Sequence, residues 1–516
     1  MPTKSLRPNL AMIFIAFLVL FGIMLACVQS ASPGDSPDWN ISGLNKAPAE
    51  GEAGVATPDP SGAGALASGG PFLTPTPDPP HPLPPPRTEV EYYTVKPGDF
   101  LSQIAQQYGV SLNQLIQANS ITDPNLVEVG VTLTIPVPTP EGKGPAFKII
   151  PDSELVYGPT AAGLDLTTFI ASQGGYLNAY SEEIEEQEVS GAKIVERVAL
   201  DYSVNPRLLL AVLEYQSGWV TQPDPQKTER AYPIGLADPY RKGLYRQLAW
   251  VANGLNRGYY LWRIHAVGNW LVDGQVLPVD PTINAGTAAV QYFFSMLYTR
   301  TGWEQAVSEN GLFKTFTALF GYPFNYGIEP LAPADLAQPE LRLPFEAGRR
   351  WSFTGGPHGG WDTGSAWSAL DFAPPGEALG CVQSDEWVTA AADGLIVRSK
   401  RGAVMQDLDG DGNEGTGWVI FYMHIETRDR VAEGTFVRAG ERIGHPSCEG
   451  GVSNGTHLHL SRKYNGEWIS ADRAPLFNLE GWTARSAGGE YDGYLDREGT
   501  TIEAWEGRRD ENAIWR

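Results

Sequence analysis

The stretch Thr456-His457-Leu458-His459-Leu460 lies near the C-terminal end of the chain and decides how the rest of the sequence is interpreted. Apolar or β-branched residues alternate with two histidines, which is the period of a half-buried strand. Residues i and i+2 of a strand project from one face, so His457 and His459 point side by side into one space, and Leu458 and Leu460 face the other side. Two imidazoles held so close suit a zinc ligand and a neighbouring proton carrier. The alternative for an isolated pair is two exposed strand histidines.

Three further positions upstream carry the same chemistry. His358 lies in the glycine-rich run GGPHGGW, Asp371 follows thirteen residues later in a short apolar run, and His424 lies in the strand-like run VIFYMHI. The pattern resembles the lysostaphin-type zinc metalloendopeptidases, which cut peptidoglycan peptides. The long interval from His358 to Asp371 and the GGPH start resemble the β-lytic branch of that family. The resemblance covers about residues 350–470.

The resemblance implies a role for each of these residues. By position, His358, Asp371 and His459 match the zinc ligands of the family, and three ligands leave a tetrahedral zinc one open position for water. Zinc lowers the pKa of that water to about 7. His457 is then the candidate general base, and His424 is expected to position the water or to stabilise the oxyanion. His445 matches no catalytic position, and we expect it at the surface.

Length and charge bound the remaining chain. At 516 residues it is too long for one ordinary core, and a net charge of −23 argues against nucleic acid and against attraction to anionic lipid. We predict a multidomain protein with a βααβ module, a mostly α middle domain and an antiparallel all-β zinc peptidase domain. The predicted divisions are 1–27 (signal), 28–91 (disordered linker), 92–138 (βααβ module), 139–169 (linker), 170–340 (helical domain), 341–480 (peptidase domain) and 481–516 (C-terminal extension).

Residues 1–27 have the pattern of an export signal. Lys4 and Arg7 precede an apolar run from Ala11 to Ala26 that is short for a membrane span. The run ends at Cys27, which resembles the acylated cysteine of a bacterial lipobox and predicts a lipid anchor in the membrane. The alternatives are cleavage near Ala31 or an uncleaved anchor. Each of these predicts that the remaining chain lies outside the cytoplasm.

The small module at 92–138 follows a segment rich in Gly, Ala, Ser and Pro, which has too few apolar residues to fold. The module contains YTVKPGD, two short helix patterns and a closing strand ending in TIP, and it resembles a LysM module almost residue for residue. That family binds the N-acetylglucosamine chains of peptidoglycan or chitin. The resemblance implies a glycan groove at Gly98, Asp99, Phe100, Leu101 and Ile121. The alternative is a LysM fold without sugar affinity.

Residues 170–340 contain long amphipathic runs that predict helices at 192–199, 206–214, 243–260 and 285–298. The stretch 202–219 resembles the first catalytic segment of soluble lytic transglycosylases. Gln216 occupies the position of the catalytic acid, and an amide cannot donate a proton to a glycosidic oxygen. Glu214 lies two positions away and faces elsewhere on a helix. We therefore predict a lysozyme-like domain without glycosidase activity, with an unrelated helical domain as the alternative.

Two cysteines lie within the predicted peptidase domain. An exported compartment permits disulfides, so Cys381 and Cys448 are expected to pair, and two buried free thiols are the alternative.

An acidic run within the same domain resembles the first half of a calcium loop. Asp407, Asp409 and Asp411 stand at positions 1, 3 and 5, and Gly412 at position 6. Trp418 replaces the glutamate at position 12, so the loop is not a full EF-hand. Calcium binding and a simple acidic turn both remain open.

The function that unites these features is that of an exported zinc metalloendopeptidase, held on peptidoglycan by its LysM module. The expected cofactor is Zn²⁺, with Ca²⁺ as an open second ion, and the expected location is the cell surface or cell wall. The alternative is a catalytically silent peptidoglycan-binding regulator or scaffold of cell-wall hydrolysis. Degenerate relatives usually lose ligands, whereas all five expected positions are filled here.

Overall fold

The computed structural model describes residues 75–96, 99–124, 128–140, 142–161 and 163–516. The predicted export signal, Cys27 and Gly98 therefore lie outside the described residues. Within the described residues, the structure contains no helix that is both long enough and apolar enough to cross a membrane.

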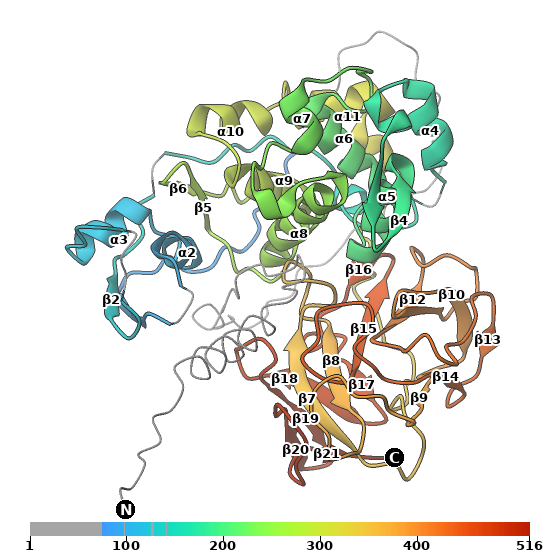
Figure 1. The fold of residues 1–516 in the computed structure, drawn as a ribbon. Coiled ribbons are helices and arrows are strands. Elements are labelled where there is room, and N and C mark those ends of the chain that lie inside the picture. Colours follow the sequence, from blue (N-terminus) through green and yellow to red (C-terminus); the bar gives the residue numbers. More distant parts are fainter. Residues whose placement is uncertain (1–74, 97–98, 125–127, 141, 162) are drawn as a thin grey trace, which may run out of the picture. The chain divides into compact units, whose positions relative to one another are not determined.

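The N-terminal module has the predicted βααβ order (Figure 1). Its elements are β1 (Glu91–Thr94), α2 (Leu101–Gln107), α3 (Leu112–Ala118) and β2 (Thr132–Ile135). Strands β1 and β2 pair in antiparallel fashion, and Ile104, Leu115 and Ile135 are buried between the helices and the strand pair. Ser111 begins α3 with a capping box, in which its side chain and that of Gln114 each accept a backbone N–H of the other residue.

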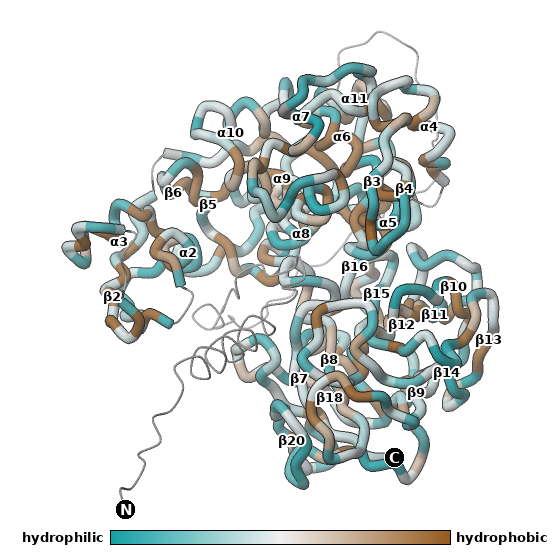
Figure 2. Tube along the Cα trace, viewed as in Figure 1, coloured by the Kyte–Doolittle hydropathy of each residue, from teal (hydrophilic) through white to brown (hydrophobic). Residues whose placement is uncertain are grey.

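The middle domain is mostly helical, and the four predicted helices are present as α5, α6, α8 and α9. Helices α6 and α9 are themselves largely hydrophobic, whereas the hairpin β3–β4 is hydrophilic (Figure 2). The domain's elements are η1 (Asp152–Glu154), α4 (Leu166–Gln173), η2 (Tyr176–Ala179), β3 (Ser181–Ile184), β4 (Gln187–Ser190), α5 (Gly191–Tyr202), α6 (Pro206–Ser217), α7 (Lys227–Ala231), η3 (Pro239–Arg241), α8 (Leu244–Arg263), β5 (Asn269–Val272), β6 (Gln275–Pro278), α9 (Ala285–Ser295), α10 (Arg300–Ala306), α11 (Leu312–Phe320) and η4 (Pro323–Tyr326).

Parts of both predicted linkers are packed against the middle domain. Ile149, Ile150 and Leu155 are fully buried in its core, so the predicted linker at 139–169 ends before residue 149. The end of the predicted linker at 28–91 is also docked. The ring of His81 stacks on that of Trp262 with centroids 4.2 Å apart, and the backbone N–H of His81 donates to the carbonyl of Pro281. Short apolar runs next to prolines and glycines gain enough contacts from a neighbouring core to become ordered, which composition alone does not reveal.

The C-terminal domain is built on an antiparallel nine-stranded sheet with the order β13-β10-β11-β12-β15-β8-β7-β21, in which β16 pairs with β15 and the final strand is β21 (Ala513–Ile514). Strands β9 and β14 form a separate pair. The strands are β7 (Trp351–His358), β8 (Ala369–Ala373), β9 (Val388–Thr389), β10 (Gly394–Lys400), β11 (Ala403–Asp407), β12 (Trp418–Met423), β13 (Phe436–Val437), β14 (Arg442–Gly444), β15 (Leu458–Tyr464) and β16 (Glu467–Trp468). The predicted His-x-His strand is β15, and Leu458 and Leu460 are buried on one of its faces.

The two faces of the sheet pack into two different cores. Along β12, Phe421 and Met423 belong to the buried cluster that includes the helical domain, whereas Ile420 and Tyr422 belong to the core of the β-domain itself. This alternation is the period-2 pattern of a strand covered on both faces. The helical domain therefore covers one face of the sheet that carries the histidines.

The C-terminal extension is part of the β-domain. Strands β17 (Asn478–Leu479), β18 (Trp482–Ser486), β19 (Gly493–Arg497) and β20 (Thr500–Glu503) form a four-stranded sheet. The last strand, β21 (Ala513–Ile514), pairs with β7 and occupies the edge of the large sheet. The pairing covers the edge of β7 at Trp351 and Ser352, and a short edge strand offers little unpaired backbone to another chain.

Candidate active site

Three adjacent strands bring the predicted metal ligands together. Strand β15 lies between β12 and β8, and their register puts His459 directly opposite Asp371. His358 is the last residue of β7, which pairs with β8 on its other side. Residues opposite each other on neighbouring strands have Cβ atoms about 4.5–5.5 Å apart, close enough for two side chains to bind one metal ion.

The three side chains converge on one point. His358 Nε2 and His459 Nδ1 each lie 3.2 Å from Asp371 Oδ1, and the two nitrogens are 3.0 Å apart. Ligands held about 2.0–2.1 Å from a tetrahedral zinc ion lie about 3.3–3.4 Å from one another. The spacing of these atoms is therefore close to that of three corners of a zinc site.

Hydrogen bonds to backbone carbonyls orient both imidazoles. His358 donates from Nδ1 to Gly356 O at 2.8 Å, and His459 donates from Nε2 to Gly360 O at 3.1 Å. A carbonyl can only accept, so each neutral ring carries its proton on the outer nitrogen and turns a lone pair toward Asp371. Three electron-rich atoms facing one another repel unless a cation lies between them.

The electrostatics of Asp371 also fit a cation. Burial raises the pKa of its carboxyl, but the positive charge that the imidazoles of His358 and His457 carry when protonated outweighs this effect and holds the pKa well below its usual range. Burial disfavours a charge on His358, yet Asp371 raises the pKa of that ring, whereas burial lowers the pKa of His459. Among the described residues, Asp371 Oδ1 is one of the few buried side-chain atoms without a hydrogen-bond partner. The carboxylate is thus ionised and available to a metal ion.

The two other histidines lie next to this cluster. His457 precedes β15, and its Nε2 is 3.8 Å from Asp371 Oδ1. His424 follows β12, and its ring centroid is 4.4 Å from that of His457. His457 donates from Nδ1 to Gly455 O at 2.8 Å, and His424 donates from Nδ1 to Glu449 O at 2.9 Å. Burial, followed by repulsion from His457 and His459, lowers the pKa of His424 well below its ordinary value, so this ring is neutral.

One feature of the site, the contact between Tyr491 and His358, had no signal in the sequence. Tyr491, from the loop between β18 and β19, stacks on His358 with ring centroids 4.2 Å apart and an interplanar angle of 21°. The backbone of the loop holds it there, because Gly356 N–H donates to Tyr491 O at 2.7 Å. Tyr491 is separated from His358 by more than a hundred residues in a segment without a recognisable motif, so only the fold reveals the contact.

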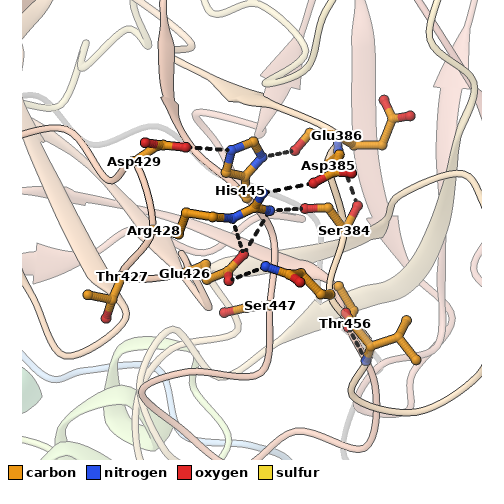
Figure 3. A network of polar contacts seen from close by, with 12 residues as sticks. Ser384, Asp385, Glu386, Glu426, Thr427, Arg428, Asp429, His445, Ser447 and Thr456 are labelled. Atoms are coloured by element: carbon orange, nitrogen blue, oxygen red, sulfur yellow. Dashed lines mark hydrogen bonds and ion pairs between the residues drawn. The ribbon is translucent and has the colours of Figure 1, made fainter.

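The prediction that His445 lies at the surface is wrong. Its side chain is buried, it donates from Nδ1 to Glu386 O at 2.8 Å, and its Nε2 lies 3.5 Å from Asp429 (Figure 3). Its ring also contacts that of Trp387, with centroids 3.9 Å apart. The glycine before it indicated a turn, but the preceding strand β14 is in the core, and the chain continues inward. His445 belongs to a polar network beside the site and not to the site itself.

The residues of the LysM module that are predicted to bind glycan differ in how exposed they are. Phe100 is 64 % exposed, whereas Leu101 is buried in the core of the module and Ile121 is partly buried against it. Asp99 accepts hydrogen bonds from Lys96 N–H and the Tyr93 hydroxyl, so its carboxylate is used within the turn. Of these four residues, Phe100 offers the largest surface to a ligand.

In the middle domain, neither Glu214 nor Gln216 has the setting of a glycosidase acid. Glu214 accepts hydrogen bonds from the backbone N–H groups of Val220 and Thr221, which caps the loop after α6. Gln216 accepts from the Tyr298 hydroxyl at 2.7 Å. A carboxylate that caps a loop is committed to the fold, so the absence of glycosidase activity stays a prediction with this added support.

The remaining predicted residues of the β-domain lie outside the histidine cluster. Cys381 and Cys448 are joined by a disulfide. One carboxylate oxygen each of Asp407, Asp409 and Asp411 lies within 4.8 Å of the others, a group that can hold a metal ion. Several of these oxygens already accept backbone N–H groups of the same loop. The loop is therefore stable as an acidic turn.

Two imidazoles and a carboxylate, with two more histidines alongside, define the site of a metallohydrolase. Comparison with known protein families shows which families the domains of the chain resemble. Residues 375–471 match the model of peptidase family M23, residues 93–136 match the LysM domain, and residues 148–333 match the model described as LasA, N-terminal domain. The lysozyme-like interpretation of the middle domain is not tested by the last match and remains a prediction.

Individual proteins are similar to parts of the chain. Protease LasA of Pseudomonas aeruginosa is 27% identical over 345 residues, which cover 63% of this chain and 75% of that protein. The β-lytic metalloendopeptidase of Achromobacter lyticus is 29% identical over 160 residues, 30% of this chain and 40% of that protein. Among solved structures, the M23 metalloprotease pseudoalterin is 25% identical over 36% of this chain and 100% of its own, with a TM-score of 0.28. The chain is therefore a metallopeptidase whose peptidase domain is similar to family M23, and it also carries a domain that matches LysM.

Proposed function

We propose that the resident metal of this peptidase is zinc, held by His358, Asp371 and His459, and that the enzyme cuts peptide bonds within peptidoglycan. The observation that carries the proposal is the convergence of two imidazole lone pairs and the unpartnered Asp371 Oδ1, with separations of 3.0–3.2 Å. Imidazole and carboxylate ligands with short, near-tetrahedral spacing suit Zn²⁺ better than Mg²⁺ or Ca²⁺, which require more oxygen ligands. A zinc ion with three protein ligands supplies a bound water of pKa about 7 and polarises a carbonyl.

We assign the proton transfer to His457. Its Nδ1–H is used by Gly455 O, so Nε2 is the free acceptor, and this atom is directed at the metal ligands, 3.8 Å from Asp371 Oδ1. An imidazole with a free nitrogen at that place can take the proton of the attacking water and return it to the leaving amine. The substrate carbonyl has to lie beside the ring for this transfer, within hydrogen-bond reach of the water.

His424 is assigned to the positioning of the water. Its Nδ1–H is donated to Glu449 O and its pKa is lowered by burial, so its Nε2 has a lone pair and no proton at neutral pH. An unprotonated nitrogen accepts hydrogen bonds, which suits the orientation of a water molecule. It cannot donate to an oxyanion, so of the two roles open to His424 from sequence we retain the first.

Digestion of purified cell walls tests the activity. We expect new amino termini to appear when walls are incubated with the protein, and to disappear when the metal is removed with a chelator and return on addition of zinc. The sequence of the released peptides identifies the bond. Soluble glycan fragments without new amino termini would contradict the proposal.

We further propose that the LysM module binds the glycan strands and keeps the peptidase on the wall. Phe100 is the residue that supports this, because aromatic surface suits the apolar faces of sugar rings and its ring is 64 % exposed. Pull-down of the whole chain with insoluble peptidoglycan should weaken when Phe100 is replaced by alanine. The matched control is Tyr240→Ala, which removes an aromatic ring that is 79 % exposed in the middle domain. Equal pull-down of both variants and wild type would refute the role of Phe100.

Two finer proposals concern calcium and the membrane. We propose that Asp407, Asp409 and Asp411 bind Ca²⁺ weakly, because the loop offers alternating carboxylates but lacks the bidentate glutamate. Terbium luminescence that is lost in Asp409→Asn tests this, and no signal in wild type would refute it. We also propose that Cys27 is acylated and anchors the protein to the membrane. Mass spectrometry of the native N-terminus decides between a lipid-modified Cys27 and an unmodified one.

A further inference from the structure

One short segment, Ser447–Glu449, connects the two histidines that do not bind the metal. The backbone N–H and the side-chain hydroxyl of Ser447 both donate to the carbonyl of His424, at 2.7 and 2.9 Å. The carbonyl of Ser447 in turn accepts the N–H of His457 at 3.3 Å, as an isolated antiparallel bridge. A single residue thus joins the backbone of the water-positioning histidine to that of the general base.

The same segment sets the ring of His424. Glu449 O accepts the Nδ1–H of His424, which fixes the tautomer and the plane of the imidazole. His424 has a φ of 64°, in the left-handed region that residues with a side chain rarely adopt. Such a conformation persists only where its surroundings hold it, and the two bonds from Ser447 to the carbonyl of His424 do so directly.

A covalent bond and a set of polar contacts fix the segment itself. Cys448 is joined to Cys381, which precedes it by 67 residues. Beside the disulfide, the Thr456 hydroxyl accepts the N–H of Val382, so the loop of Cys381 is also attached to the residue before His457. The Glu449 carboxylate accepts the N–H and the hydroxyl of Thr427, at 2.8 and 2.7 Å.

The polar network in Figure 3 holds the loops that flank the segment Ser447–Glu449. Arg428 donates to Asp385 at 2.8 Å and to Glu426 at 3.2 Å, and His445 donates to the carbonyl of Glu386. Glu426 N–H donates to His445 O, which connects the loop after His424 to the strand end before Ser447. The buried His445 therefore has a structural role in this assembly.

We propose that the segment Ser447–Glu449, anchored by the Cys381–Cys448 disulfide, is a positioning element that aligns His424 and His457 for turnover. The inference rests on the proposed function, in which these histidines orient and deprotonate the water. None of the residues of the segment contacts His358, Asp371 or His459 through a described hydrogen bond. Loss of the segment's contacts therefore lowers turnover and leaves the metal in place.

The test compares variants that weaken the segment in different ways. Ser447→Ala removes one bond to the carbonyl of His424 and the bond that the hydroxyl accepts from Glu449 N–H at 3.0 Å, and Ser447→Thr restores the hydroxyl. The double variant Cys381→Ser with Cys448→Ser releases the covalent anchor. Ser399→Ala is the matched control. The Ser399 hydroxyl also donates to a backbone carbonyl, that of Val431, but Ser399 lies on β10, which β11 separates from β12.

The expected result is a division between metal content and turnover. Misplacement of a catalytic group by about 1 Å can cost about 10²-fold, so we expect kcat to fall about 10-fold in Ser447→Ala and about 10²-fold in the double variant. Zinc content and KM should stay at the wild-type level, Ser447→Thr should recover most of the loss, and Ser399→Ala should change nothing. Nitrogen-15 NMR of the histidine rings should report a second tautomer of His424 in Ser447→Ala.

Three outcomes overturn the proposal. Wild-type kcat in Ser447→Ala would show that its hydroxyl does not act through His424, even if the double variant fails to fold. Parallel loss of zinc and activity would assign the segment to the metal site and not to the two histidines. A wild-type protein that binds zinc but releases no new amino termini from cell walls would refute the proposed function, and the positioning role with it.

Discussion

Removal of the Arg398 guanidinium should destabilise the protein, because this group is enclosed between the helical domain and the sheet. Arg398 donates to Asp201 of α5 at 2.6 Å and to Glu414 at 3.1 Å, and all three side chains are buried. Replacement by methionine fills similar volume but leaves two buried carboxylates without their main partner. Breaking a buried ion pair costs about 3–5 kcal/mol.

The remaining partners set the expected cost near the lower end of that range. Asp201 keeps Arg401 at 3.5 Å, and Glu414 keeps Lys463 at 3.8 Å. We therefore expect Arg398→Met to lower the free energy of unfolding by about 3 kcal/mol. With a urea dependence of about 3 kcal/mol per molar, the midpoint of urea unfolding falls by about 1 M.

The matched control is Arg485→Met, which breaks an exposed pair with Asp496 at 2.9 Å. Exposed pairs contribute about 1 kcal/mol or less, so this midpoint should move by a few tenths of a molar at most. Circular dichroism, followed across a urea series, measures both variants under the same conditions. If Arg398→Met moves the midpoint no further than Arg485→Met, the buried network does not join the two domains as described.

The other predictions concern the docked linker and the loop beside the metal site. Burial, followed by repulsion from His265, lowers the pKa of His81 to about 4, so in the unfolded chain this ring binds a proton at a higher pH than it does in the folded chain. Stability from this site is therefore complete above about pH 6.5 and is lost as the pH falls toward 4, by about 1–2 kcal/mol after allowance for partial exposure. Thermal unfolding of His81→Gln should lack that loss, and parallel pH profiles for variant and wild type would contradict it. In Gly360→Ala the added carbon would lie 2.7 Å from Trp468, and this clash displaces the Gly360 carbonyl that orients His459. Zinc affinity, measured by competition with a chelator, should therefore fall about 10- to 100-fold. The control Gly163→Ala has open space around the added carbon and should bind zinc as wild type does.

The sequence was most informative where a local period coincided with a chemical motif. The alternation in THLHL predicted both the strand and the common face of His457 and His459, because side-chain direction in a strand depends only on residue parity. The helices α5, α6, α8 and α9 followed from their apolar periodicity in the same way. What the sequence alone did not contain was the register that puts Asp371 opposite His459, since pairing between distant strands depends on the whole sheet.

The predictions that differ from the structure share a physical cause. Burial of His445, docking of His81 and packing of Ile149 all result from contacts with residues far away in the chain. A glycine turn or a proline-rich segment indicates local irregularity, but local irregularity does not determine exposure. The stacking of Tyr491 on His358 is of the same kind, because it depends on the fold of the C-terminal hairpin.

The most direct test of the central assignment measures zinc content and activity together in two variants of the His-x-His strand. His459→Ala removes one of three proposed ligands, so zinc per chain and release of new amino termini should fall together. His457→Ala keeps all three ligands and should therefore retain about one zinc ion per chain, with a rate lower by about 10²–10⁴-fold. An empty metal site in His457→Ala with a filled one in His459→Ala would mean that the two roles are reversed, and full zinc and full activity in both would contradict the metallopeptidase site described here.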